Sequence, residues 1–288
     1  MGHISVLAAE AVDALALRPD GRYVDATFGA GGHSARILAA LGSTGRVVAV
    51  DADPGARTRA IVDPRFTLVH ANFRDLAGVL DDLSLPQVDG VLYDLGVSSM
   101  QFDEAARGFS FREAAALDMR LDPSRGESAA EFIARVDETE LADVIFRYGD
   151  ERNSRRIARA IKLRQPRDTM QLAGVVAGAV HVRGKRERIH PATRTFQALR
   201  IAVNDELGAL EASLDAALER TREGGRIAVI SFHSLEDRIV KQRFRDDPRA
   251  VRVTRKPIVP GETELAANPR ARSAKLRVCA VTHQEAHA

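Results

Sequence analysis

The residues with the clearest chemical potential in this chain are three glycines and an acid near its start. Gly29, Gly31 and Gly32 follow a short apolar run, and Asp51 ends a second apolar run about 20 residues later. Glycines let a backbone approach a ligand closely, and an acid at this distance usually binds ribose hydroxyls. The spacing therefore predicts a strand, a glycine turn, a helix and a second strand that together bind a nucleotide-like ligand.

Two neighbouring residues bear on which ligand this is. The dinucleotide fingerprint has a third glycine where this chain has Ser34. Asp25 ends the first strand, where a carboxylate would repel a pyrophosphate but suit the ammonium or sulfonium of S-adenosylmethionine. The pattern favours the methyl donor. An NAD-dependent oxidoreductase, and a turn that only tightens the strand–helix joint, are the alternatives.

The elements that position these residues alternate between strands and helices. Apolar runs at 47–50, 66–69 and 88–95 predict further buried strands, as in a doubly wound α/β sheet. In such sheets ligands collect at the carboxyl ends of the strands. We therefore expect one rim to carry Asp25, Asp51, Phe73 and Asp94.

The alternation stops after residue 103, and no strand pattern returns until residue 226. The sequence predicts an α/β sheet domain in two parts, 1–103 and 192–288, interrupted by a helical insertion at 104–191. It also predicts a helix over 3–17 and a long helical stretch over 193–219. Alternating patterns at 251–253 and 275–281 predict an edge pair of strands, with Cys279 as a core residue.

Charge is segregated along the chain although the net charge is only +2. Residues 152–200 carry a balance of +11 and residues 238–277 a balance of +8, which suggests a polyanionic partner. Solvated basic helix faces are the alternative. The single cysteine and the lack of zinc-like spacing predict a cytoplasmic protein with no metal site. No apolar run is long enough to suggest a membrane span.

Several longer motifs add a resemblance to this picture. They lie at residues 25–34, 94–99, 107–111, 117–120, 190–201, 230–241 and 268–273. Together they resemble the bacterial small-subunit ribosomal RNA (cytosine-N4)-methyltransferases of the MraW type, in the order of that family and over nearly the whole chain. Met100, where many relatives have proline, and residues 113–116 depart from the family pattern.

The resemblance implies a class I, Rossmann-like, S-adenosylmethionine-dependent methyltransferase sheet with an inserted all-helical domain for substrate recognition. The implied reaction is methylation of the N4 amine of a cytidine in the decoding region of 16S rRNA, either as naked RNA or within the small ribosomal subunit. The choice between a monomer and a homodimer stays open. By position, the implied donor site comprises Gly31, Gly32, His33, Asp51, Phe73, Asp94 and Gln101.

Substrate contacts are less closely specified. Asp94 is the candidate to accept a hydrogen bond from the reacting amine, although the resemblance favours donor binding for it. A carbon-5 reaction would need a cysteine nucleophile, which the expected burial of Cys279 disfavours. A non-catalytic RNA-binding factor on the same fold is a further alternative. The candidate RNA contacts, each with a structural role as its alternative, are Phe109, Phe111, His190, Arg194, Arg200, His233, Ser234, Arg270 and Arg272.

Overall fold

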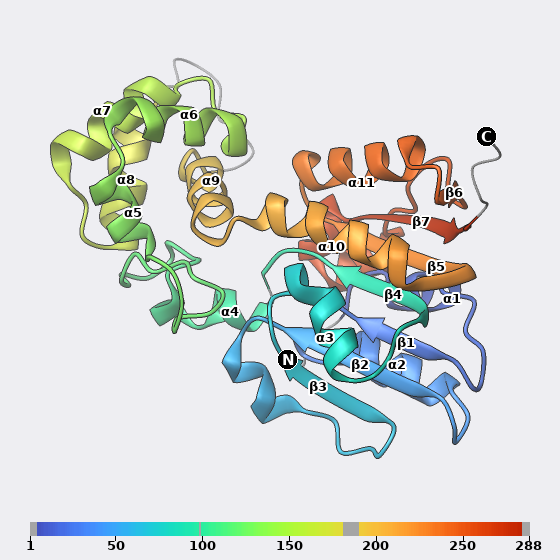
Figure 1. The fold of residues 1–288 in the computed structure, drawn as a ribbon. Helices are drawn as coiled ribbons and strands as arrows, with labels where there is room; N and C mark the ends of the chain where they lie inside the picture. Colours follow the sequence, from blue (N-terminus) through green and yellow to red (C-terminus); the bar gives the residue numbers. More distant parts are fainter. Residues whose placement is uncertain (1–4, 98, 181–189, 284–288) are drawn as a thin grey trace. The chain divides into compact units, whose positions relative to one another are not determined.

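The computed structural model describes residues 5–97, 99–180 and 190–283 (Figure 1). The chain divides into two compact units. The sheet unit comprises Met1–Gly96 and Leu207–Ala288, and the helical unit comprises Val97–Glu206. The helical unit is longer at both ends than the expected insertion at 104–191, because Val97 and the helix Ala192–Asn204 pack into its core.

The sheet unit contains a seven-stranded sheet in the order β3-β2-β1-β4-β5-β7-β6. Pairings among the first five strands are parallel, whereas β7 runs antiparallel to both β5 and β6. The predicted α/β, Rossmann-like class I fold is confirmed, as is the edge pair formed by the last two strands. The strands are β1 Arg22–Asp25, β2 Arg46–Asp51, β3 Phe66–His70, β4 Val88–Asp94, β5 Thr221–Ser231, β6 Ala250–Arg252 and β7 Lys275–Val281.

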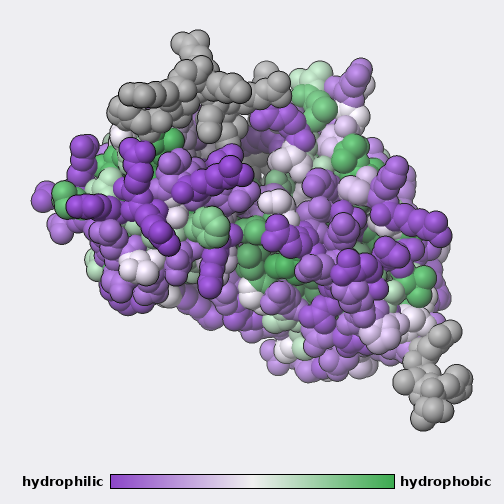
Figure 2. Space-filling view, turned by 90° about the horizontal axis from the view of Figure 1, so that it is seen from above, coloured by the Kyte–Doolittle hydropathy of each residue, from purple (hydrophilic) through white to green (hydrophobic). Residues whose placement is uncertain are grey.

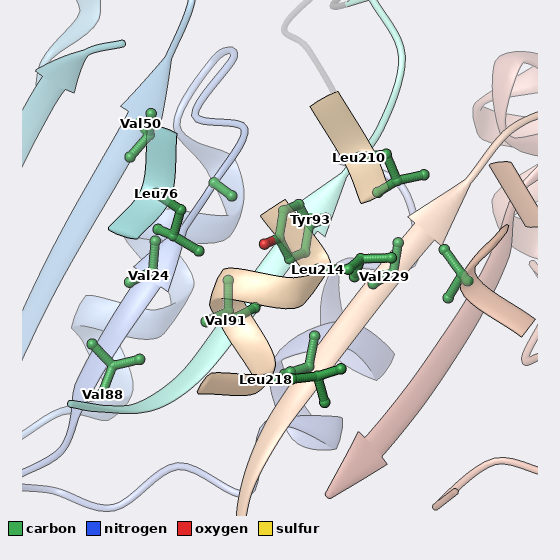
Figure 3. Packing of buried hydrophobic residues seen from close by; sticks show 14 of the residues in the cluster. Val24, Val50, Leu76, Val88, Val91, Tyr93, Leu210, Leu214, Leu218 and Val229 are labelled. Atoms are coloured by element: carbon green, nitrogen blue, oxygen red, sulfur yellow. The ribbon is translucent and has the colours of Figure 1, made fainter. Parts of the chain in front are cut away.

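Helices cover both faces of this sheet because successive strand residues point to opposite sides. On β4, Val91 and Tyr93 join the core beneath α3, α10 and α11, whereas Leu92 joins the core beneath α1 and α2. Figure 3 shows the first of these cores, with Leu210 and Leu214 of α10 against the strands. The helices of this unit are α1 Ala8–Ala14, α2 Gly32–Ala40, α3 Leu76–Asp82, α10 Glu206–Arg220, α11 Ser234–Asp246 and α12 Glu262–Ala267.

The helical unit has its own core, built from apolar faces of its helices and from Phe109, Leu117 and Met119 of the preceding loop. Polar side chains cap several of these helices; Ser128 and Glu131 form a capping box at the start of α5. Its helices are α4 Ser99–Asp103, α5 Ala129–Arg135, α6 Glu138–Gly149, α7 Ser154–Arg164, α8 Thr169–Ala179 and α9 Ala192–Asn204.

Three local predictions differ from the structure. The long helical stretch 193–219 is two helices, because Asp205 has a left-handed backbone (φ 45°) that ends α9 before α10 begins. The expected helix 3–17 is reduced to α1, since Leu7 is also left-handed (φ 48°). Gly224 and Gly225, a pair that by its sequence predicts a turn, lie within β5, beside a register shift in its pairing with β4.

The polarity of the surface and the burial of the single cysteine agree with the expectations from the sequence. In the view of Figure 2, hydrophilic residues cover most of the surface, with hydrophobic residues in scattered groups. Within the described residues, no helix combines the length and apolar character needed to cross a bilayer. Cys279 is a buried free thiol in β7, as predicted.

Candidate functional site

The candidate site is the rim where the parallel strands end. Asp25, Asp51 and Asp94 are the last residues of β1, β2 and β4, respectively. The strands β1 and β4 are neighbours in the sheet although they are far apart in sequence, so the chain changes direction across the sheet between them. Ligands of open α/β sheets bind at such a switch point.

The glycine turn links β1 to α2 with little room for side chains. Gly29 and Gly31 have positive φ angles of 53° and 81°. A Cβ on Gly31 would lie 2.8 Å from the ring of Phe28, so the turn has no space for a side chain at residue 31. The turn therefore leaves its peptide groups close to the rim, as the sequence predicted.

Asp25 is held inside this turn. Its carboxylate is fully buried and accepts hydrogen bonds from the Ser34 hydroxyl (2.7 Å) and the Thr27 amide (3.2 Å). Burial raises the pKa of Asp25 above its usual value. Ser34, which replaces the third glycine of a dinucleotide site, is thus a partner of the strand-end acid.

Asp51 organises the opposite side of the turn. Its two carboxylate oxygens accept the amide N–H groups of Gly29 (2.7 Å) and Asp53 (2.8 Å). Burial again raises the carboxyl pKa. Each carboxylate oxygen can accept a second hydrogen bond, so Asp51 keeps the capacity to bind a pair of ribose hydroxyls.

Asp94 is the least satisfied of the three acids. Its amide donates to the Thr27 hydroxyl (2.6 Å), and its Oδ2 lies 3.6 Å from Nδ1 of His33. Its other oxygen, Oδ1, is buried and has no hydrogen-bond partner among the described residues. Burial raises the pKa of Asp94 to about 6; His33 opposes this shift, and Asp25 and Glu236 add to it. A buried acceptor without a donor suits a ligand that brings an N–H group or a positive charge.

His33 is buried next to Asp94 at the start of α2. Its Nε2 lies 3.1 Å from the carbonyl oxygen of Val6. Since a carbonyl oxygen only accepts, Nε2 carries the hydrogen, and the other ring nitrogen faces Asp94. The expected contact of His33 with the donor stays a prediction.

The two remaining donor-site candidates lie in different units. Phe73 begins a short 3₁₀ helix after β3, and its ring meets that of Tyr93 edge-on with centroids 6.0 Å apart. Gln101 is a buried residue of α4 in the helical unit. The sheet unit thus contains Gly31, Gly32, His33, Asp51, Phe73 and Asp94, and the helical unit contains Gln101.

His233 and Ser234 follow β5 at the start of α11. The Nδ1 atom of His233 accepts the Glu236 amide (3.3 Å), and the Glu236 carboxylate accepts the amides of His233 (3.2 Å) and Phe232 (2.8 Å). This is a capping box with histidine in place of the usual hydroxyl residue. His233 therefore has a structural task, whereas Ser234 is exposed.

Most candidate RNA contacts in the helical unit already have partners. Phe109 is buried in the core, and the Phe111 ring lies 4.8 Å from that of His190 and 4.9 Å from that of Phe196. RNA contacts by these residues stay predictions. Two guanidinium groups are paired with acids, Arg194 with Glu151 (3.6 Å) and Arg200 with Glu206 (2.8 Å).

On the sheet unit, Arg270 and Arg272 are exposed on the 3₁₀ helix Pro269–Ser273.

The sequence pattern did not predict two residues of the rim. Thr27, within the glycine motif, connects the ends of β1 and β4, and its polar side chain two residues after the strand-end acid was the only signal. Glu236 is buried in the first turn of α11, which follows β5, and its position three residues after His233 was the overlooked capping signal.

Comparison with known proteins adds to this geometry. The model of the MraW methylase family matches residues 1–282. Proteins named ribosomal RNA small subunit methyltransferase H are similar along almost their full length. That of Nitrosomonas europaea is 50% identical over 304 residues, and that of Azoarcus sp. BH72 is 51% identical over 300 residues, each alignment covering 96% of both chains. A solved rRNA methylase from Streptococcus thermophilus aligns with a TM-score of 0.47 and 12% identity over 98% of this chain and all of that chain. By the family match and the identity of these relatives, the chain belongs to the MraW methylase family.

Proposed function

We propose that this protein transfers a methyl group from S-adenosylmethionine to the N4 amine of a cytidine in the decoding region of small-subunit (16S) ribosomal RNA. Membership of a methylase family supports the reaction class and its cofactor. The names of the relatives support small-subunit RNA as the substrate. The observation that carries the proposal is the buried Oδ1 of Asp94 at the switch point of the sheet, for which the described residues provide no hydrogen-bond partner.

The rim fits the methyl donor residue by residue. Asp51 would accept the ribose hydroxyls, and the backbone of Gly31 and Gly32 would lie against the donor. Asp94 would accept an N–H group or face the positive charge, which relieves its missing hydrogen bond. When bound, S-adenosylmethionine supplies an electrophilic methyl group on a sulfonium.

The chain must place the acceptor amine in line with that methyl group, about 3 Å away. The cytosine amine is a weak nucleophile because its lone pair is delocalised into the ring, and an acceptor for its N–H bonds would free that lone pair. Asp94 has one oxygen beside His33 and one oxygen that is unpartnered within the part of the chain that the structure describes. We assign that unpartnered oxygen to the donor rather than to the amine, as the resemblance does.

The proposed RNA interface is the exposed face of α7. Its opposite face is buried through Ile157, Ala158 and Ile161. The outer face and its flanks carry exposed arginines for which the described part of the chain provides no ion pair: Arg152, Arg155, Arg156, Arg159, Arg164 and Arg167. Unpaired, solvent-facing guanidinium groups can neutralise phosphates and release their counterions.

Many arginines of the sheet unit are instead paired with acids. Arg65 bonds to Asp63 at 2.7 Å and Arg245 to Asp246 at 2.6 Å. The positive charge of α7 is therefore available to a partner, whereas the charges of Arg65 and Arg245 are compensated by neighbouring acids. This supports the helical unit as the part that holds RNA.

The test is methyl transfer from labelled S-adenosylmethionine to small subunits that lack the modification, with naked 16S rRNA as a parallel substrate. The RNA is then digested and the labelled nucleoside is identified. N4-methylcytidine is the expected product. Any other labelled nucleoside would overturn the assignment of the acceptor atom, and absence of label from both substrates would overturn the proposed function.

A further inference from the structure

We propose that Glu264 is a positioning residue for the methyl-donor site, acting through the chain segment 5–7 and His33. The inference rests on the proposed function, because the donor site is part of that proposal. Glu264 itself lies in α12, outside the rim. It would act by fixing the backbone of segment 5–7, which contacts the glycine turn and the imidazole of His33.

The first step is the bond between Glu264 and the N-terminal segment. Glu264 Oε1 accepts the amide hydrogen of Leu7 at 2.7 Å, across 257 positions of sequence. Leu7 has a left-handed backbone and no side-chain cap of its own at the start of α1. Because a non-glycine residue keeps this conformation only where its surroundings hold it, the carboxylate has a specific task at this point.

The second step is the contact of the segment with the glycine turn. A Cβ on Gly32 would collide with the side chain of Ser5, so the segment lies directly against the first residue of α2. The carbonyl of Val6 accepts the hydrogen of His33 Nε2 at 3.1 Å. Segment 5–7 therefore contacts two successive residues of the proposed donor site.

The third step leads from His33 to Asp94. By accepting from Nε2, Val6 fixes the tautomer and the ring orientation of His33. The other ring nitrogen then faces Oδ2 of Asp94 at 3.6 Å, and Oδ1 of Asp94 is the acceptor left without a partner among the described residues. A displaced Val6 carbonyl would let the imidazole turn, and Nδ1 of His33 would no longer face Oδ2 of Asp94.

Packing alone does not provide the same constraint. The side chains of Val6 and Leu7 are buried in the same core cluster as Ile37 and Leu38, and this apolar packing would persist without Glu264. Apolar contacts are non-directional, however, whereas the orientation of the Val6 carbonyl depends on how the neighbouring Leu7 peptide is held. The carboxylate of Glu264 supplies that directional constraint.

The experiment compares Glu264→Ala with Glu264→Gln in the full chain. Glutamine keeps an acceptor oxygen for the Leu7 amide, whereas alanine does not. Calorimetric titration with S-adenosylmethionine should show about fivefold weaker binding for the alanine variant and near-normal binding for the glutamine variant. Imidazole ¹⁵N shifts should move away from the Nε2–H form of His33 in the alanine variant only.

Glu262→Ala is the matched control, since it removes an exposed acid from the same helix without touching segment 5–7. If the alanine variant does not fold, Glu264→Asp gives the same comparison, because it keeps the charge but shortens the reach. Equal donor affinity and equal His33 shifts in all variants would overturn the role of Glu264 while the proposed function stands. A lack of donor binding by the unaltered protein would overturn both.

Discussion

The hydroxyl of Ser34 donates a 2.7 Å hydrogen bond to the fully buried carboxylate of Asp25. This bond ties the first turn of α2 to the end of β1. It explains why the chain has serine where a dinucleotide site has glycine, since glycine would remove the side-chain hydrogen bond to this buried carboxyl group.

Ser34→Ala should therefore lower the free energy of unfolding by about 1.5–3 kcal/mol, the usual contribution of a hydrogen bond to a charged group. Denaturant titration measures it. Ser124→Ala is the matched control, because Ser124 donates a 2.6 Å bond to Asp122 on the exposed surface. There the loss should stay below about 0.5 kcal/mol, and equal losses at both positions would contradict the importance of burial.

Donor binding should weaken as the pH falls through about 6, the value to which burial raises the pKa of Asp94. The ionised carboxylate is the form that would bind an N–H group or a positive charge. Calorimetry with S-adenosylmethionine across this pH range measures the effect. Asp94→Asn should bind about tenfold more weakly at pH 7.5 and lose this pH dependence; an unchanged profile would assign the titration to another group.

The same substitution should stabilise the protein at neutral pH. Because the folded-state pKa of Asp94 is raised, the folded state binds its proton more tightly than the unfolded state does. Its contribution to stability is therefore lost as the pH rises from the usual aspartate value through about 6. Asp94→Asn removes the buried charge, so unfolding at pH 7.5 should require about 1–3 kcal/mol more, and a destabilised variant would contradict this explanation.

Gly31→Ala should destabilise the protein and weaken donor binding. The residue has a φ angle of 81°, and its new Cβ would lie 2.8 Å from the Phe28 ring. Gly126→Ala is the control, since Gly126 has a φ angle of 68° but open space around it. In thermal unfolding, we expect Gly126→Ala to lower the free energy of unfolding by about 1–2 kcal/mol and Gly31→Ala to lower it clearly more. Equal losses for the two variants would argue against the steric role of Phe28.

The double variant Arg155→Gln, Arg159→Gln should weaken RNA binding and reduce its salt dependence. Removing one phosphate contact lowers the slope of log affinity against log salt by about 0.7 for single strands. Arg245→Gln removes an exposed but paired cation and should leave the slope nearly unchanged. Filter binding to 16S rRNA at several salt concentrations measures this. Equal slopes for the unaltered protein and both variants would place the RNA interface elsewhere.

Much of the sheet could be predicted because buried parallel strands are near-continuous apolar runs. The runs at 47–50, 66–69 and 88–95 correspond to β2, β3 and β4. The division of the helical stretch 193–219 at Asp205 could not be predicted, because the apolar spacing of a helix continues past this residue. What ends α9 is one left-handed residue, and an aspartate that adopts this conformation has no distinguishing sequence pattern.

For the site, the sequence pattern predicted the acids at the strand ends. It did not predict the hydrogen bonds made by the residues around these acids. Asp25, Asp51 and Asp94 do end their strands. The bond from Leu7 to Glu264 joins residues with no local pattern in common. Likewise, the link from His33 to the Val6 carbonyl involves a backbone group, which any residue type could provide.

The division of the chain also has a consequence for synthesis. The helical unit is one uninterrupted stretch, Val97–Glu206, whereas the sheet unit needs segments from both sides of it. As the nascent chain emerges, β4 keeps an open edge until β5 appears, and β6 has no partner until β7 follows. Open strand edges invite wrong pairing. We therefore expect the helical unit to fold first during translation, and the sheet to close only when the last strand leaves the ribosome.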